Sequence, residues 1–213
     1  HGKWRDENGR KDFSVKSRSQ LKAIFVRHSE STGNAADLVK GTSEYPLDAK
    51  GKRESQAIGP RIARFKPTVV ITSPLSRAKE PAKQIAKAAG VKLKVDRGLL
   101  PQDFGTLEGT PRKTGEPKIR RLAMRTPDKK MPGGESTTAW DGKASRAMRR
   151  VKRIVSNGGR PAVVTHSRNL RELSHHLFGG KFKDPTRGGP EPSGFVTWSG
   201  KKKLVIHKGA AKS

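Results

Sequence analysis

Short apolar runs alternate along the chain with longer, mainly polar stretches in which apolar residues recur every three or four positions. The runs are typical of buried strands, and the stretches are typical of amphipathic helices. The predicted strands are residues 21–26, 68–72, 91–95 and 162–165, with two more strands near the C-terminal end. The predicted helices are residues 50–65, 76–89, 138–156 and 169–178. This alternation predicts an α/β domain built on a mostly parallel sheet.

Two features limit this scheme. Pro81 lies inside the helix predicted over residues 76–89, and proline is tolerated in a helix only near its first turn, so we expect the regular helix to begin after Ser76. Residues 98–131 lack a long periodic pattern and are interpreted as an irregular insertion with a short helix at 118–124. The predicted organisation is a polar N-terminal arm at 1–20, one domain at 21–208 and a short tail at 209–213.

The charge is strongly positive, at +28 from 47 Lys and Arg against 19 Asp and Glu. Residues 112–160 hold 15 of these bases against 4 acids, and residues 143–153 hold six bases and no acid. An uncompensated basic helix is either a solvated face or a surface for a polyanion, and we favour the second. The expected partner is nucleic acid bound without sequence preference, or another polyanion, with membership of a larger complex as a further possibility.

The absence of cysteine excludes disulfides and thiolate zinc sites. No apolar stretch approaches the roughly 20 residues that span a bilayer, and no signal-peptide pattern is visible, which predicts no membrane association and a cytoplasmic or other intracellular location. The sequence begins with His1 rather than Met. We therefore expect a processed product or a fragment, from which targeting information is missing.

Polar residues follow three of the predicted strands directly. The first strand ends at Arg27 and His28, the second at Ser73 with Arg77 close behind, and a later one at His166. Ligand sites of open parallel sheets lie outside the carboxyl ends of the strands, so these segments should converge. Two histidines and two arginines beside helix N-termini suit a phosphate dianion.

Several segments resemble the histidine phosphatase, or phosphoglycerate mutase-like, superfamily over roughly residues 21–207. The pieces occur in the order of the family and are Val26-Arg27-His28-Ser29-Glu30-Ser31-Thr32-Gly33-Asn34, Pro46-Leu47-Asp48 with Gly51, Gln56 and Ala57, Ser73-Pro74-Leu75-Ser76-Arg77-Ala78, Phe104-Gly105 with Glu108-Gly109, Pro132-Gly133-Gly134-Glu135-Ser136, and Val164-Thr165-His166. The resemblance implies a three-layer α/β sandwich with helices on both faces of the sheet. It also implies hydrolysis of a phosphorylated substrate through a phosphohistidine, without a metal or cofactor.

In this resemblance His28 is the nucleophile, while Arg27, Arg77, His166 and Asn34 hold the phosphate. The positive charge of Arg27 disfavours protonation of the neighbouring His28 imidazole and so preserves its lone pair. Guanidinium groups suit the charge that spreads over the phosphoryl oxygens in the transition state. We therefore predict a metal-independent phosphatase of phosphate monoesters.

The sequence departs from the family at the proton donor. Many members have Glu four residues before the glycine of the Phe-Gly pair, and this chain has Pro101, which cannot donate a proton. Asp103 and Glu108 are the nearby replacements, and we prefer Asp103. If neither serves, a weak or inactive domain acting as a basic, nucleic-acid-binding component of a larger assembly is the alternative.

Two further residues are assigned to the substrate pocket. Ser29 occupies a position where the family commonly has glycine and is expected to narrow the space beside His28. Glu135 either lines the substrate end of the pocket or is an acid that favours the start of the next helix.

Overall fold

The computed structural model describes residues 21–178, 192–199 and 204–207. The predicted arm at 1–20 and tail at 209–213 lie outside these residues. The strands are β1 (Ala23–Arg27), β2 (Val69–Thr72), β3 (Leu93–Val95), β4 (Pro161–Thr165), β5 (Phe195–Trp198) and β6 (Leu204–His207). The helices are α2 (Thr32–Ala35), α3 (Ala49–Ala63), α4 (Ser76–Ala89), α5 (Arg112–Arg125), α6 (Thr137–Ser156) and α7 (Ser167–Phe178), with 3₁₀ turns η1 (Arg97–Leu99) and η2 (Gly105–Leu107).

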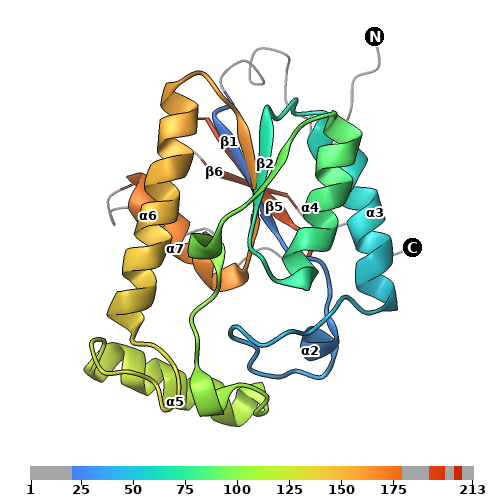
Figure 1. Cartoon of the computed structure of the whole chain (residues 1–213). Helices are drawn as coiled ribbons and strands as arrows, with labels where there is room; N and C mark the ends of the chain where they lie inside the picture. Colours follow the sequence, from blue (N-terminus) through green and yellow to red (C-terminus); the bar gives the residue numbers. More distant parts are fainter. Residues whose placement is uncertain (1–20, 179–191, 200–203, 208–213) are drawn as a thin grey trace.

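The strands form one sheet in the order β3-β2-β4-β1-β5-β6. The first four are parallel, with Val26 of β1 opposite Val164 of β4, while β5 and β6 are antiparallel. Helices α3 and α4 cover one face of this sheet and α6 and α7 cover the other (Figure 1). The predicted α/β sandwich with a mostly parallel central sheet is therefore confirmed.

The apolar run of β1 is continuous because both of its faces are covered. Ile24 and Val26 pack into the core formed with α3 and α4, whereas Ala23 and Phe25 pack into the core formed with α6 and α7. All four side chains are buried. Such a central parallel strand cannot show the polar and apolar alternation of a half-exposed strand.

Helix α4 begins at Ser76, so the prediction of a later start was wrong. Leu75, which precedes the helix, offers no side-chain cap, but the carboxylate of Glu44 accepts hydrogen bonds from the amide and the hydroxyl of Ser76. A carboxylate satisfies free amides at a helix N-terminus and interacts favourably with the helix dipole. Pro81 is accommodated inside the helix, where its ring is buried. Gly90 ends the helix in the left-handed conformation, with φ of 66°.

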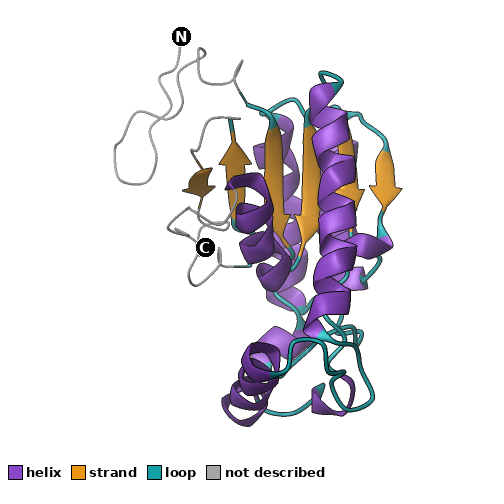
Figure 2. Cartoon of the chain, turned by 90° about the vertical axis from the view of Figure 1, so that its left-hand side faces the viewer, coloured by secondary structure: helices purple, strands orange, loops and turns teal. Residues whose placement is uncertain are grey.

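The insertion contains more helix than its sequence predicted. The short helix expected at residues 118–124 is the longer α5. Val39, Ile119 and Met131 form a separate small core that holds α5 against the chain. The arrowheads of the parallel strands point toward the end of the sheet where α2 and α5 lie (Figures 1 and 2). This insertion and the α2 region therefore border the carboxyl ends of the strands.

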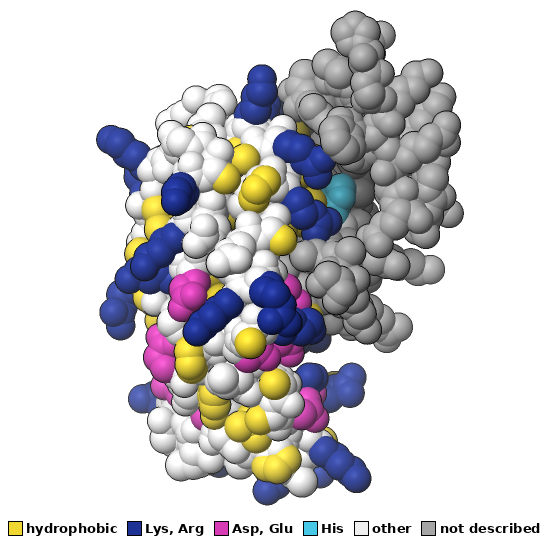
Figure 3. Space-filling view, turned by 90° about the vertical axis from the view of Figure 1, so that its right-hand side faces the viewer, with side chains coloured by type: hydrophobic (Ala, Val, Ile, Leu, Met, Phe, Trp, Pro, Cys, Tyr) yellow, Lys and Arg dark blue, Asp and Glu magenta, His cyan; other side chains and the backbone are white. Residues whose placement is uncertain are grey.

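Acids from other segments pair with part of the basic surface of α6. Lys143 forms an ion pair with Glu135, and Arg150 forms two hydrogen bonds with Asp96, at 2.6 and 2.8 Å. The other bases at 143–153 include the exposed Arg146, Arg149 and Arg153. On the face that carries α3 and α4, Lys and Arg side chains are scattered, with acidic side chains among them (Figure 3). Nucleic-acid binding stays a prediction from charge.

None of the described helices combines the length and the apolar character that crossing a membrane requires.

Candidate active site

The ends of β1, β2 and β4 bring the predicted site residues together. His28 follows β1 and His166 follows β4, and their ring centroids are 5.2 Å apart. Ser73, which follows β2, contacts Nε2 of His166 through its hydroxyl oxygen at 2.9 Å. Both histidines and Arg77 are at least 96% buried. The parallel arrangement of the three strands is what places their ends at one edge of the sheet.

The structure defines the tautomer of His28. Its Nδ1 lies 2.7 Å from the backbone carbonyl oxygen of Ser29. A carbonyl oxygen only accepts, so Nδ1 carries the proton and Nε2 keeps its lone pair. Burial, and then the positive charges of Arg77 and Arg27, hold the pKa of His28 well below its usual value. The ring is thus neutral at neutral pH, with burial as the main cause and the predicted effect of Arg27 as a smaller one.

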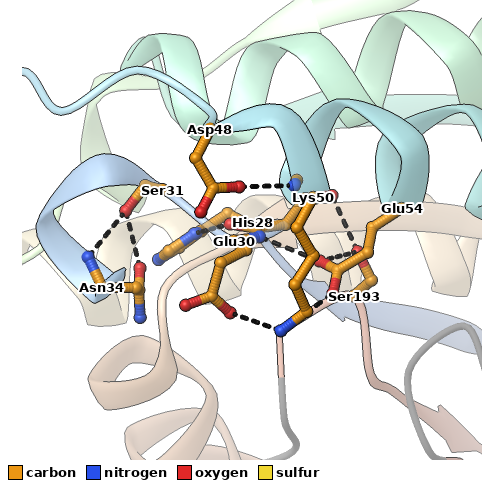
Figure 4. Close-up of polar contacts among 10 residues, drawn as sticks. His28, Glu30, Ser31, Asn34, Asp48, Lys50, Glu54 and Ser193 are labelled. Carbon is orange, nitrogen blue, oxygen red and sulfur yellow. Dashed lines mark hydrogen bonds and ion pairs between the residues drawn. The ribbon is translucent and has the colours of Figure 1, made fainter. Parts of the chain in front are cut away.

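A buried network fixes the backbone around His28 (Figure 4). The hydroxyl groups of Ser29 and Ser193 are 2.7 Å apart, and Ser193 donates to Oε2 of Glu54 at 3.3 Å. The same oxygen accepts from the Glu30 amide at 2.9 Å, and the Ser193 amide donates to the His28 carbonyl at 3.2 Å. Ser29, expected to narrow the pocket, is fully buried and turns its hydroxyl to Ser193. The network therefore holds in place the Ser29 carbonyl, which accepts the hydrogen bond from Nδ1 of His28.

We expect replacement of Ser193 by alanine to lower kcat by about 10-fold with little change in KM, because misplacing a reacting group slows chemistry more than binding. Ser193 has φ of 58°, a conformation that favours glycine. Ser193→Gly therefore serves as a matched control that loses the same hydroxyl but relieves the backbone. Steady-state kinetics should show equal losses of kcat in both variants, and denaturation should show the glycine variant to be the more stable. If both variants kept the kcat of the wild type, Ser193 would have no role in positioning His28.

Arg77 is held by the loop that precedes α3. Its Nη1 donates to the Ser43 carbonyl and its Nη2 to the Gly41 carbonyl, both at 2.7 Å. Its Nε is buried and has no hydrogen-bond partner among the described residues. Burial lowers the pKa of Arg77 to about 10, so the guanidinium stays charged at neutral pH. It brings a fixed positive charge to the site, and its Nε–H group is available to donate to a ligand.

His166 is a second neutral imidazole. Burial, followed by the charge of Arg77, lowers its pKa well below the usual value. Its Nδ1 is buried without a hydrogen-bond partner in the described part of the chain. Leaving a buried polar atom unsatisfied costs about 1–3 kcal/mol, which a bound ligand can recover.

Asn34 lies in α2, which was not predicted. The Ser31 hydroxyl caps this short helix, lying 3.3 Å from the Asn34 amide, and also donates to Asn34 Oδ1 at 2.6 Å (Figure 4). This second contact orients the side-chain amide and leaves its Nδ2 group to donate. Asn34 is half-buried, consistent with a side chain at the border of the site.

The carboxylate of Glu108 joins two loops. Its Oε1 accepts from the amides of Thr42 and Phe104 at 2.8 and 3.0 Å, and its Oε2 accepts from the amide of Ser43 at 2.8 Å and from the Ser43 hydroxyl. Ser43 in turn supplies a carbonyl to Arg77. Both carboxylate oxygens are thus occupied by donors of the two loops, so this arrangement suits a structural role better than proton donation.

Asp103 and Glu135 hold each other's segments. Oδ1 of Asp103 accepts from the Gly105 amide at 2.9 Å, and its backbone carbonyl accepts from the Glu135 amide at 3.1 Å. Oε1 of Glu135 accepts from the Asp103 amide at 3.0 Å, and Oε2 pairs with Lys143. Ser136, rather than Glu135, caps α6. Glu135 therefore anchors the segment after Pro101, and Asp103 keeps one carboxylate oxygen that this turn does not use.

One basic residue of the site was not singled out in the sequence. Lys40 is half-buried, and its charge contributes to lowering the pKa of both His28 and His166. Glu54 and Ser193 were also missed, because only the fold brings them behind His28. No local pattern marks these residues, although a Lys directly before a loop glycine was a position to examine. Among the described residues, no group of three or more His, Asp or Glu is placed to hold a metal ion.

Residues 23–197 match the family model described as the histidine phosphatase superfamily (branch 1). The chain belongs to this superfamily. A curated relative, the probable phosphoglycerate mutase GpmB of Salmonella paratyphi C, is 33% identical over 163 residues, which are 75% of each chain. The chain and that relative thus match over three quarters of the length of each.

Solved structures show the same fold. A mycobacterial glucosyl-3-phosphoglycerate phosphatase matches with a TM-score of 0.68 and 22% identity, covering 86% of this chain and 96% of that one. A phosphoglycerate mutase from Thermus thermophilus matches with a TM-score of 0.67 and 23% identity, covering 89% of this chain and 99% of that one. At this identity the likeness establishes the phosphoglycerate mutase-like fold and leaves the reaction to be argued from the site.

Proposed function

We propose that this member of the superfamily hydrolyses phosphate monoesters without a metal, through a phosphohistidine on His28. The observation that carries the proposal is the hydrogen bond from His28 Nδ1 to the Ser29 carbonyl in a buried, positively charged surrounding. It leaves an unprotonated Nε2 at neutral pH, which is the nucleophile that attack on phosphorus requires.

In the first step the Nε2 lone pair forms a bond to phosphorus while the ester P–O bond breaks. Arg27 and Arg77 balance the charge on the phosphoryl oxygens, and the buried Nε–H group of Arg77 donates a hydrogen bond to one of them. The leaving alkoxide takes a proton from an acid. In the second step the carboxylate left by that acid takes a proton from water, which attacks the phosphohistidine; the N–P bond breaks, phosphate leaves, and the acid and neutral His28 are both restored. Asn34 and His166 complete the phosphate site.

Asp103 is our proposed proton donor. Glu108 is held by donors on both oxygens, whereas the Asp103 turn uses one oxygen. We expect Asp103→Asn to lower kcat/KM by about 10²-fold for an alkyl phosphate but little for a nitrophenyl phosphate, whose leaving group needs no proton. Parallel kinetics on both esters test this. The matched Glu108→Gln variant should be less stable and should lower kcat/KM for both esters by the same factor. If Asp103→Asn also lowered kcat/KM equally for both esters, Asp103 would be excluded as the acid.

The proposed reaction is tested by labelling and turnover together. The purified full chain, treated with chelator, should hydrolyse a nitrophenyl phosphate, and rapid denaturation during turnover should trap phosphate that is labile in acid and stable in base. Product analysis with an added alcohol acceptor separates hydrolysis from phosphoryl transfer to that acceptor. A protein that neither turns over nor labels with any phosphate donor would refute the proposal.

A further inference from the structure

The backbone of Ser73 is held where β2 ends. Its amide donates to the Val164 carbonyl at 3.1 Å, and its carbonyl accepts from the Thr72 hydroxyl at 3.1 Å. The Ser73 side chain is fully buried. Val164 belongs to β4, the strand that His166 follows. These contacts therefore set the position of the Ser73 hydroxyl relative to the imidazole of His166.

The neighbours of the Ser73 hydroxyl determine where its hydrogen lies. Within the described residues its oxygen contacts two nitrogens, the Leu75 amide at 3.5 Å and Nε2 of His166 at 2.9 Å. A backbone amide only donates, so it cannot accept the hydroxyl hydrogen. Nε2 of His166 is the acceptor that remains, and buried polar groups in folded proteins are hydrogen-bonded. Ser73 thus donates to Nε2, and this nitrogen carries no proton.

The same contact assigns the proton of His166 to its other ring nitrogen. Burial, and then the charge of Arg77, hold the pKa of His166 well below its usual value, so the ring is neutral at neutral pH. A neutral imidazole has one N–H group, and with Nε2 as an acceptor this group is Nδ1–H. Nδ1 is buried and has no hydrogen-bond partner among the described residues. It presents a donor to a ligand oxygen, rather than a lone pair that would repel one.

The two neighbouring imidazoles differ because each contacts a different kind of oxygen. The Ser29 carbonyl accepts from Nδ1 of His28 and leaves a lone pair on Nε2, whereas the Ser73 hydroxyl donates to Nε2 of His166 and leaves an N–H on Nδ1. We propose that Ser73 is a positioning residue that fixes the tautomer of His166 and so makes its Nδ1–H a donor to a phosphoryl oxygen. The inference rests on the proposed function for the identity of the anion, but the tautomer itself exists without a ligand.

Nuclear magnetic resonance tests the tautomer directly. In the full chain made with isotope-labelled histidine, correlation spectra between ring nitrogens and carbon-bound protons separate a protonated nitrogen from an unprotonated one, and His166→Gln assigns the signals. Without ligand, the wild type should show protonated Nδ1 and unprotonated Nε2 in His166. In Ser73→Ala the proton should move at least in part to Nε2, because the donor to that nitrogen is gone.

The matched control is Thr72→Val, which removes another buried hydroxyl at the end of β2 that contacts a carbonyl instead of a histidine. This variant should keep the wild-type tautomer. A proton on Nε2 of His166 in the wild type, or an unchanged tautomer in Ser73→Ala, would overturn the inference.

Binding of inorganic phosphate gives a second readout. Calorimetry should show about 10-fold weaker binding in Ser73→Ala, the scale of one hydrogen bond. In a His166→Gln background the same substitution should have little further effect, because the amide of glutamine donates without depending on a tautomer. Equal losses of affinity in both backgrounds would show that Ser73 acts on the fold alone and would overturn the inference. Since phosphate binding needs no turnover, these results stand apart from a failure to find phosphohistidine.

Discussion

Turnover in the His28→Ala variant is expected to fall by about 10⁴-fold or more, because the residue that forms the covalent bond in the proposed mechanism is absent. Trapped phosphohistidine should disappear at the same time. The physical reason is specific: the neighbouring imidazole of His166 has its Nε2 engaged by Ser73 at 2.9 Å and is not oriented by a carbonyl as His28 is. Rapid-quench kinetics with a labelled phosphate donor measure the turnover rate and the trapped phosphohistidine on one sample.

A matched variant separates loss of the nucleophile from damage to the buried site. His166→Gln removes the other imidazole, which is buried to a similar extent, and should still label while turning over more slowly. Circular dichroism and denaturation check that both variants are folded. Labelling that persists in His28→Ala, or that is lost only in His166→Gln, would move the phosphohistidine to His166.

The second large effect is expected at Arg77. Arg77→Lys should lower kcat/KM by about 10²–10³-fold, as for loss of a fixed donor to a developing anion, because the single ammonium of lysine lacks the planar fork of five N–H donors with which the guanidinium reaches two carbonyls and still faces a ligand. Unfolding should also become easier by about 3 kcal/mol, since the carbonyls of Gly41 and Ser43 each lose the hydrogen bond from the guanidinium. Steady-state kinetics and denaturant titration measure the two losses.

The control for this substitution is Arg53→Lys, at an exposed position of α3. Its kcat/KM and its free energy of unfolding should equal those of the wild type within experimental error. Restoration of activity in Arg77→Lys by added guanidinium-containing small molecules would support a direct role of the guanidinium. A normal kcat/KM in a folded Arg77→Lys protein would show that Arg77 serves the 41–43 loop alone, and would leave Arg27 as the principal cation of the site.

The proposed site was predicted mainly from residues that follow strands. His28, Ser73 and His166 were linked because parallel strands present their carboxyl ends together, and the structure places their side chains in contact or nearly so. The local environment of these side chains could be predicted less well from the sequence. Burial contributes more than Arg27 to the lowered pKa of His28, and burial is a property of the packed chain.

The errors in secondary structure have a similar origin. Helix α4 begins early because Glu44, 32 residues away, supplies the cap that Leu75 lacks. Helix α5 extends beyond its predicted part because Val39 and Met131, far apart in the chain, bury Ile119. Contacts over such distances override local preferences for helix or loop.

The sequence by itself determined the α/β alternation, the parallel sheet and the order of the phosphate-binding segments, because these depend on apolar spacing and on short motifs. Tertiary structure alone decided the roles of residues whose partners are distant. Ser29 meets Ser193 across 164 positions, Lys40 gains its positive neighbours, and Glu108 is drawn to the 42–43 loop. Hydrogen bonding and desolvation depend on groups within a few ångströms in space. The separation of two residues along the chain does not reveal whether the fold brings them within that distance.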